Sequence, residues 1–337
     1  MSQITVATFN MLNLADAGFA YYPNADPYTA QEYAAKITWS AAQLDTLRAD
    51  VVLCQEVFSL KALEDCVAAS SWMRGATVIA PHTDVLQPDA SKLPRLAVIS
   101  RLPIKEWHSH TDIPAAAQVT LMDGTKHAKF SRPVLELEVD VHGQALRLMT
   151  VHLKSKRPDW ADNADEDSPK AHTAAKLQSL LKRAAEAAGV RELVVYQLWH
   201  TSTPFIIMGD FNDTLPSPTT QLIAATQWKT RQREARDAML YDAWDISAHH
   251  DISRNAPARR DVGYTHIFEG VGEVIDQCLV SEEFAPFSRH QIGYVQRVDI
   301  FNDHLNQRLR GVQGSKTAMS DHGQIAVQLV FNEADKV

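Results

Sequence analysis

Cysteine is scarce in this chain of 337 residues, which contains only Cys54, Cys66 and Cys278. Three thiols cannot form a disulfide framework, and their spacings are not those of a metal site. Cys54 and Cys278 lie in apolar runs, so we expect buried free thiols and a protein of the reducing cytoplasm.

Long apolar segments and a basic leader are also missing. No run approaches the roughly 20 apolar residues that span a bilayer, so we expect no transmembrane segment. Residues 1–7 carry no basic group and enter a strand-like pattern at once, so we expect no signal peptide. The net charge of −8 and the pI of about 5.9 exclude a protein that coats nucleic acid by charge alone. They still allow an enzyme with a local basic cleft or a divalent cation.

The composition is that of an ordinary globular protein, with 45% apolar and 22% charged residues. Hydrophobic periodicity predicts more strands than helices. The expected strands are residues 4–9 (ending at Asn10), 50–57, 77–80, 96–100, 134–141, 146–151, 205–208, 273–281 and 324–331, and the expected helices are residues 30–48, 59–69, 171–188 (capped by Gly189) and 219–226. Because no repeat or linker divides them, we expect one domain over residues 1–337, with an acidic mobile loop at 157–169 and another loop at 302–318.

One stretch combines a buried strand with polar residues at its end. Residues 205–208 are all apolar, Gly209 interrupts them, and Asp210 and Asn212 follow. Residues i and i+2 of an extended chain point to the same side, so these two side chains are expected to project together. A carboxylate beside an amide suits a water molecule or a phosphate oxygen near a metal ion, although an Asp–Asn turn explains the pair equally well.

Polar side chains follow several other apolar strands. They are Asn10, Glu56, His152, Asp276, Asp321 and His322. Each has an ordinary structural interpretation, such as a turn, a cap or a buried histidine, but ligand sites in packed sheets form at such strand ends. Carboxylates and amides suit Mg²⁺, whereas histidines suit proton transfer or phosphate binding. The set therefore predicts metal-assisted hydrolysis of a phosphate ester.

Six short motifs occur in a fixed order. They are Thr8-Phe9-Asn10, Gln55-Glu56-Val57, Val151-His152-Leu153-Lys154-Ser155, Gly209-Asp210-Phe211-Asn212, Ile275-Asp276-Gln277 and Ser320-Asp321-His322-Gly323. Over nearly the whole chain, this order resembles the endonuclease/exonuclease/phosphatase superfamily, which has the deoxyribonuclease-I-like fold. The resemblance implies the α/β (α+β) class, as a four-layer α/β/β/α sandwich of two packed, mostly antiparallel sheets flanked by helices.

The resemblance also implies which residues hold the metal and the substrate. Glu56, Asn10 and Asp321 are expected to bind Mg²⁺ or Mn²⁺. Asn10, Lys154 and Asn212 are expected to contact the substrate phosphate. Leu12 stands where some members carry an acid, which leaves a second metal contact from the first strand open.

The catalytic residues implied by the resemblance are His152, Asp210, Asn212, Asp276 and His322. Asp210 is expected to orient or deprotonate the attacking water, with Asn212 beside it. His322 is expected to meet the scissile phosphate while Asp276 orients its ring. His152 is expected to contact the phosphate or assist the leaving group.

Another acid–histidine pair, Asp303 and His304, either lines the same cleft or caps a turn, and we favour the turn. The motifs of the inositol-phosphatase branch are not present, because Asp213-Thr214-Leu215 and Gln277-Cys278-Leu279 stand in their place.

Three functions remain as alternatives. The first is a divalent-metal-dependent phosphodiesterase, most simply a nuclease acting on DNA or RNA, whose backbone would meet the basic residues Lys154, Lys156, Arg157, Arg95 and Arg132. The second is a phosphoesterase for a small molecule or a lipid headgroup, which the acidic surface favours, although the sequence shows no clear exposed aromatic hairpin for membrane docking. The third, an inactive binding module, ranks last because no motif residue is replaced by an inert one. Endo- or exo-cleavage, the number of metals and the oligomeric state stay open.

Overall fold

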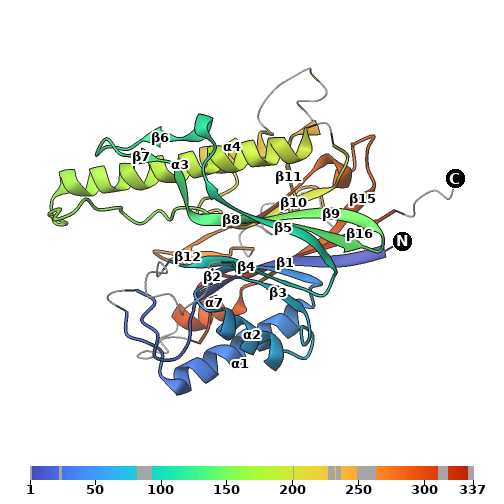
Figure 1. Ribbon diagram of the computed structural model, residues 1–337, viewed down its shortest axis with the longest axis horizontal. Helices are drawn as coiled ribbons and strands as arrows, with labels where there is room; N and C mark the ends of the chain where they lie inside the picture. Colours follow the sequence, from blue (N-terminus) through green and yellow to red (C-terminus); the bar gives the residue numbers. More distant parts are fainter. Residues whose placement is uncertain are drawn as a thin grey trace.

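The computed structural model describes residues 2–22, 25–81, 93–199, 201–226, 232, 237–248, 263–309 and 318–332. Two six-stranded sheets pack face to face, and helices cover both outer faces (Figure 1). Among the described strands of these sheets, only the β1–β2 and β9–β10 pairings are parallel. The predicted four-layer sandwich of mostly antiparallel sheets is confirmed.

The first sheet has the order β15-β16-β1-β2-β4-β3. Its strands are β1 (Ser2–Leu14), β2 (Val51–Val57), β3 (Thr77–Ile79), β4 (Arg95–Ser100), β15 (Gly293–Phe301) and β16 (Gln324–Phe331), and its helices are α1 (Ala30–Leu47) and α2 (Leu60–Ala69). The alternation of β1 explains both of its contacts. Ile4 and Val6 enter the core between the sheets, whereas Ala7 and Phe9 pack against the helix layer.

The second sheet has the order β11-β14-β10-β9-β8-β5. Its strands are β5 (Ile104–Asp112), β8 (Lys129–Val141), β9 (Gln144–His152), β10 (Phe205–Asp210), β11 (Tyr241–Asp242) and β14 (Asp276–Val280), and its helices are α3 (Pro169–Leu198) and α4 (Pro218–Ala224). Along β10, Ile206 and Met208 face the first sheet, whereas Phe205 and Ile207 face the helices. The expected strands 134–141 and 146–151 pair as an antiparallel hairpin, β8–β9.

Helix α3 does not end where the sequence predicts. Gly189 was expected to cap it, but this is wrong, because the helix continues to Leu198. A Cβ added at Gly189 would lie 3.0 Å from the side chains of both Ile113 and Phe130, so the residue is small for packing and not for a left-handed cap. Val194 and Leu198 extend the buried face beyond it.

Two further boundaries differ from prediction. Strand β1 does not end at Asn10 but kinks at Leu12 (φ 47°) and Asn13 (φ 54°) and continues to Leu14. The expected loop at 302–318 contains helix α7 (Asp303–Leu309), and residues 310–317 lie outside the described part. The remaining short elements are η1 (Ala115–Ala117), β6 (Val119–Thr120), β7 (Lys126–His127), β12 (His266–Phe268), β13 (Val271–Glu273) and η2 (Glu282–Phe284). No described helix has the length and apolarity needed to cross a membrane.

The two parallel pairings decide where polar strand ends meet. The carboxyl ends of parallel strands share one edge of a sheet. Strands β1 and β2 therefore place Asn10 and Glu56 at one edge of the first sheet, and β9 and β10 place His152 and Asp210 at one edge of the second sheet. The antiparallel neighbours β14 and β16 begin at the same end, which lies away from the two chain termini (Figure 1).

Candidate active site

A cavity of about 450 Å³ opens where these strand ends meet. The predicted residues that line it are Glu56, His152, Asp210, Asn212, Asp321 and His322. Asn10 and Asp276 lie directly behind the lining, because they contact Asp210 and His322 respectively. The structure thus brings together all the predicted strand ends.

The centre of the second sheet places Asp210 beside His152. The two residues are register partners, and Nε2 of His152 lies 3.4 Å from Oδ2 of Asp210. Gly209 allows this approach, since a Cβ there would lie 2.1 Å from the carbonyl oxygen of Val151. With its φ of +146°, only glycine fits this position readily.

Asn212 forms the turn that the sequence left as an alternative. Its backbone N–H donates to Oδ1 of Asp210 at 2.8 Å, and its φ is 52°. Its side-chain amide donates to the carbonyl of Leu153 at 2.9 Å. Asn212 therefore satisfies both interpretations at once. Its turn holds the carboxylate of Asp210 in place, and Asn212 itself still lines the cavity.

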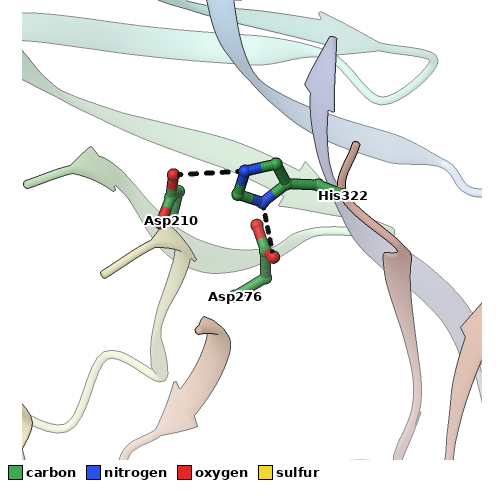
Figure 2. A group of neighbouring side chains, drawn as sticks. All are labelled: Asp210, Asp276 and His322. Carbon is green, nitrogen blue, oxygen red and sulfur yellow. Dashed lines mark hydrogen bonds and ion pairs between the residues drawn. The ribbon is translucent and has the colours of Figure 1, made fainter. Parts of the chain in front are cut away.

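His322 lies between two carboxylates from the other sheet, as Figure 2 shows. Its Nδ1 lies 2.9 Å from Oδ2 of Asp276, and its Nε2 lies 3.8 Å from Oδ2 of Asp210. With Asp276 accepting the Nδ1 proton, the ring orientation is fixed and Nε2 is directed toward Asp210.

Burial and charge set the protonation of this cluster. Burial raises the pKa of Asp210 to about 7, an effect that His322 opposes and Asp276 reinforces. Burial alone would lower the pKa of His322, but the carboxylates of Asp276 and Asp210 raise it well above its usual value. Burial and the nearby charges of Arg132 and His322 hold the pKa of His152 well below its usual value. At neutral pH, His322 therefore suits donation of a proton or hydrogen bond, whereas His152 is neutral.

The first sheet supplies Glu56 through a left-handed backbone conformation, with φ of 60°. The N–H of Asn13 donates to Oε2 of Glu56 at 3.0 Å, and the amide nitrogen of Asn10 lies 3.4 Å from Oε1. The same amide nitrogen donates to Oδ2 of Asp210 at 3.2 Å, while the amide oxygen accepts the N–H of Leu12. Asn10 therefore joins the two carboxylates, and its nitrogen rather than its oxygen faces them.

The donor set fits a hard divalent cation. Glu56, Asp210 and Asp321 place three carboxylates on the cavity wall, and oxygen ligands are what Mg²⁺ prefers. In the described part of the chain, one tighter cluster has metal-binding geometry, with ligand atoms of Asp210, Asp276 and His322 within 4.8 Å of one another. Because its imidazole is a poor ligand for Mg²⁺ and is already paired with Asp276, this cluster better fits proton transfer. Metal binding by Glu56, Asn10 and Asp321 stays a prediction.

Three of the five basic residues that the sequence suggested line the cavity, namely Arg132, Lys156 and Arg157, and Lys176 joins them. Lys154 is half-buried and, like Arg95, is not part of the described lining. Lys156 forms ion pairs with Glu273 (3.3 Å) and Asp213 (3.6 Å). The acidic segment 157–169 contributes Arg157 and Pro158 to the same wall, so its first residues do reach the site; its mobility stays a prediction.

His304 supports the site from behind. It lies at the start of α7, is buried, and its Nε2 lies 2.9 Å from the carbonyl oxygen of His322. Neither Asp303 nor His304 belongs to the described lining of the cavity. The preferred prediction, that Asp303 and His304 cap a turn, was wrong, because these two residues begin helix α7. The alternative, that they line the cleft, is not supported either.

Thr265, His266 and Phe268 are among the residues of the site that were not identified from the sequence. The hydroxyl of Thr265 accepts the backbone N–H groups of Ile275 and Asp276, both at 3.1 Å. His266 lines the cavity, with its ring centroid 5.1 Å from that of His322. Phe268 follows on the β12–β13 hairpin and also lines the cavity, so the view that no exposed aromatic hairpin exists was wrong. No motif marks these residues, because their role arises only when the hairpin packs beside His322.

The model of the Endonuclease/Exonuclease/phosphatase family matches residues 7–322. The chain belongs to this family. Its members are hydrolases acting on phosphoester bonds and typically use divalent metals, in keeping with the buried acidic and histidine cluster. Among curated proteins, none matches the chain in sequence.

Solved structures of the endonuclease/exonuclease/phosphatase family share the fold. A family protein from Bacteroides thetaiotaomicron is 17% identical with a TM-score of 0.56, over 98% of this chain and 96% of that one. The mannosyl-6-phosphatase of B. thetaiotaomicron is 17% identical with a TM-score of 0.54, over 97% of this chain and 100% of that one. TDP2 from D. rerio, complexed with a single strand DNA product, is 13% identical with a TM-score of 0.53, over 98% of this chain and 100% of that one.

Proposed function

We propose that this protein is a Mg²⁺- or Mn²⁺-dependent phosphodiesterase that hydrolyses DNA or RNA. The observation that carries the proposal is the meeting, in one cavity, of the buried carboxylate of Asp210, the imidazole of His322 fixed by Asp276, and the separate open carboxylate of Glu56. These are a base, a phosphate-binding acid and a cation ligand, the set that phosphoester hydrolysis requires.

The chain's own residues divide the work. Asp210, held by the N–H of Asn212, accepts the proton of the attacking water. His322, fixed by Asp276, donates a hydrogen bond from Nε2 to a phosphate oxygen and stabilises the charge that develops there. His152 contacts the phosphate from the neighbouring strand. A divalent cation held by Glu56 and Asp321, with Asn10 orienting the carboxylate of Glu56, would polarise the phosphate and stabilise the leaving oxygen.

Two observations favour nucleic acid as the substrate. Four basic side chains line the cavity beside its carboxylates although the net charge of the chain is −8, so cationic groups are available there to a phosphate backbone. TDP2, which shares the fold, has been found with a single strand DNA product. A small phosphoester is the second candidate, because Lys156 is already paired with Glu273 and Asp213 and one neighbour is a mannosyl-6-phosphatase.

A substrate panel tests the proposal. Single-stranded and duplex DNA, RNA, nucleotides, sugar phosphates, inositol phosphates and sphingomyelin are compared in Mg²⁺, in Mn²⁺ and in EDTA. We expect hydrolysis of DNA or RNA that EDTA abolishes and either metal restores. DNA should inhibit the hydrolysis of a small chromogenic diester, and this inhibition should weaken steeply as the salt concentration rises if the enzyme binds the DNA backbone. Inhibition that does not depend on salt would support the small-substrate alternative. Activity that persists in EDTA would contradict the metal dependence.

A further inference from the structure

The β12–β13 hairpin carries an aromatic side chain into solvent at the edge of the cavity. Phe268 is 51% exposed and its register partner Val271 is 64% exposed. Phe268 and Ile267 line the cavity, whereas Val271 lies outside the lining. A ligand that covers the ring of Phe268 at the wall of the cavity would gain the free energy of burying this apolar surface.

The hairpin is attached to the catalytic residues at its base. Glu269 (φ 49°) and Gly270 (φ 82°) form a tight two-residue turn of the kind that matches strand twist. A Cβ at Gly272 would lie 2.8 Å from the ring of Tyr264, so the two are in close contact. His266 forms a backbone bridge with His322. The position of Phe268 is thus fixed relative to His322.

The spacing along β12 relates Phe268 to the reacting phosphate. His266 lies beside the ring of His322, and Phe268 is two residues further along the same strand. Two residues advance a strand by about 7 Å and return the side chain to the same face. A sugar ring bridges such a separation, so a phosphate held at His322 would bring an attached base to Phe268.

We propose that Phe268 is a stacking platform for the base next to the scissile phosphate, so that the enzyme prefers phosphodiesters that carry a base. This inference rests on the proposed function, which places the phosphate at His322. Bases stack on aromatic side chains in single-stranded nucleic acid binding without demanding one sequence. Docking to an anionic membrane fits less well, because the same hairpin carries Glu269 and Glu273.

The test compares a short oligothymidylate with the abasic oligomer of the same length, which keeps the sugars and phosphodiesters. We expect the wild type to have a kcat/KM about tenfold or more higher on the strand that carries bases. Phe268→Ala should bring the ratio close to one, mainly by raising KM for oligothymidylate. Phe268→Trp should keep the preference, and Phe268→Leu, apolar but not planar, should lose most of it.

Val271→Ala is the matched control, because it removes an exposed apolar group from the same hairpin outside the cavity lining. It should leave the preference unchanged. A base preference that survives in Phe268→Ala overturns the inference. The inference is also overturned if Phe268→Ala keeps the preference for the strand that carries bases but no longer binds vesicles of phosphatidylcholine and phosphatidylserine. That result would assign Phe268 to membrane docking.

A binding measurement separates this inference from the proposed function. If the wild type hydrolyses no phosphoester in Mg²⁺ or Mn²⁺, the proposed function is wrong. Calorimetry without metal then compares thymidine 5′-monophosphate with deoxyribose 5-phosphate. Tighter binding of the nucleotide by the wild type, lost in Phe268→Ala and kept in Val271→Ala, supports the platform. Equal binding of the two ligands, or a difference that Phe268→Ala retains, rejects it.

Discussion

The two sheets hold their sides of the site in different ways. At the end of the second sheet, His152, Asp210 and Asp276 are 4%, 1% and 0% exposed, and burial shifts the pKa of both His152 and Asp210. At the end of the first sheet, Glu56 is only partly buried and lines the open cavity. A buried side tunes proton transfer, whereas an open carboxylate leaves oxygen atoms accessible to a hydrated cation.

The backbone reflects the same division. In the first sheet, Leu12, Asn13 and Glu56 all have positive φ, and this kink lets the N–H of Asn13 bind Glu56. In the second sheet, Gly209 has no Cβ, and neighbouring strands approach closely. Non-glycine residues with positive φ gather at functional sites, where the local structure enforces them. Asn212 (φ 52°) shows that the end of the second sheet also contains one such residue. Backbone strain therefore shapes the metal side most, whereas close packing at Gly209 is specific to the proton-transfer side.

The largest effect should come from the buried side. Asp210→Asn removes the base, and we expect kcat/KM to fall by about a thousandfold or more, a loss that excess Mg²⁺ does not restore. Steady-state kinetics at a series of Mg²⁺ concentrations measures the fall in kcat/KM and shows whether added metal restores it. Asp299→Asn, on β15, is the control and should retain activity. Activity of Asp210→Asn within tenfold of the wild type would remove Asp210 from the proposed mechanism.

The open side should respond differently to metal. Glu56→Gln keeps the shape of the side chain but loses its charge, so we expect metal affinity to fall by about 10- to 100-fold. Activity at limiting Mg²⁺ should fall accordingly and recover in part at high Mg²⁺, which distinguishes it from Asp210→Asn. Calorimetric titration with Mn²⁺ gives the affinity directly. An unchanged affinity would show that Glu56 does not bind the metal.

Close packing in the second sheet predicts a loss of stability. Gly209→Ala places a Cβ 2.1 Å from the carbonyl oxygen of Val151, so strands β9 and β10 must separate. We expect the free energy of unfolding to fall by about 3 kcal/mol or more in urea denaturation. Gly124→Ala is the control, because it shares a positive φ but meets no atom within 4 Å. Its cost should be about 1 kcal/mol, from the backbone alone. Equal costs would argue against the close approach.

Most of the fold was predictable because each inner strand faces two cores. Strands β2 and β10 therefore begin with short, wholly apolar runs, residues 51–54 and 205–208, that are easily recognised. Strand β5 was not predicted, since Ile104–Asp112 lies at a sheet edge and is rich in charged residues and histidine. Gly189 misled for another reason: its small size serves packing against Phe130, which a local pattern does not contain.

The site was predictable only where a residue lies next to an apolar strand of the two large sheets and belongs to a recognisable motif. Asp210 and Glu56 meet both conditions at the ends of β10 and β2, and His322 meets them just before β16. Thr265 and His266 meet neither, because their contacts with Asp276 and His322 depend on how a two-stranded hairpin docks at the site. The basic residues were predicted in part: Arg132, Lys156 and Arg157 line the cavity, whereas Lys154 does not, and Lys176 of helix α3 belongs to no motif.

The two helix layers offer a last comparison, since each long helix anchors a loop through a carboxylate. Asp45 of α1 accepts the hydroxyl and N–H groups of residues 70–72, and Glu186 of α3 accepts the N–H groups of Ser131 and Lys154. Burial opposes the ionisation of both carboxyl groups. For Asp45, the hydrogen bonds outweigh burial and lower the pKa to about 2. For Glu186, the hydrogen bonds, together with His127 and the charge of Arg132, also lower the pKa.

Neutral variants should therefore cost stability, and more in the second layer. Glu186 is buried and Asp45 is not, so we expect Glu186→Gln to lose about 3 kcal/mol and Asp45→Asn about 1 kcal/mol at pH 7. A carboxylate whose folded pKa is depressed stabilises above its unfolded pKa, and this is lost as pH falls through the folded value. The deficit of Asp45→Asn should thus shrink between about pH 4 and pH 2 in urea titrations. A deficit that does not change with pH would show that the lost packing, and not the charge, holds residues 70–72.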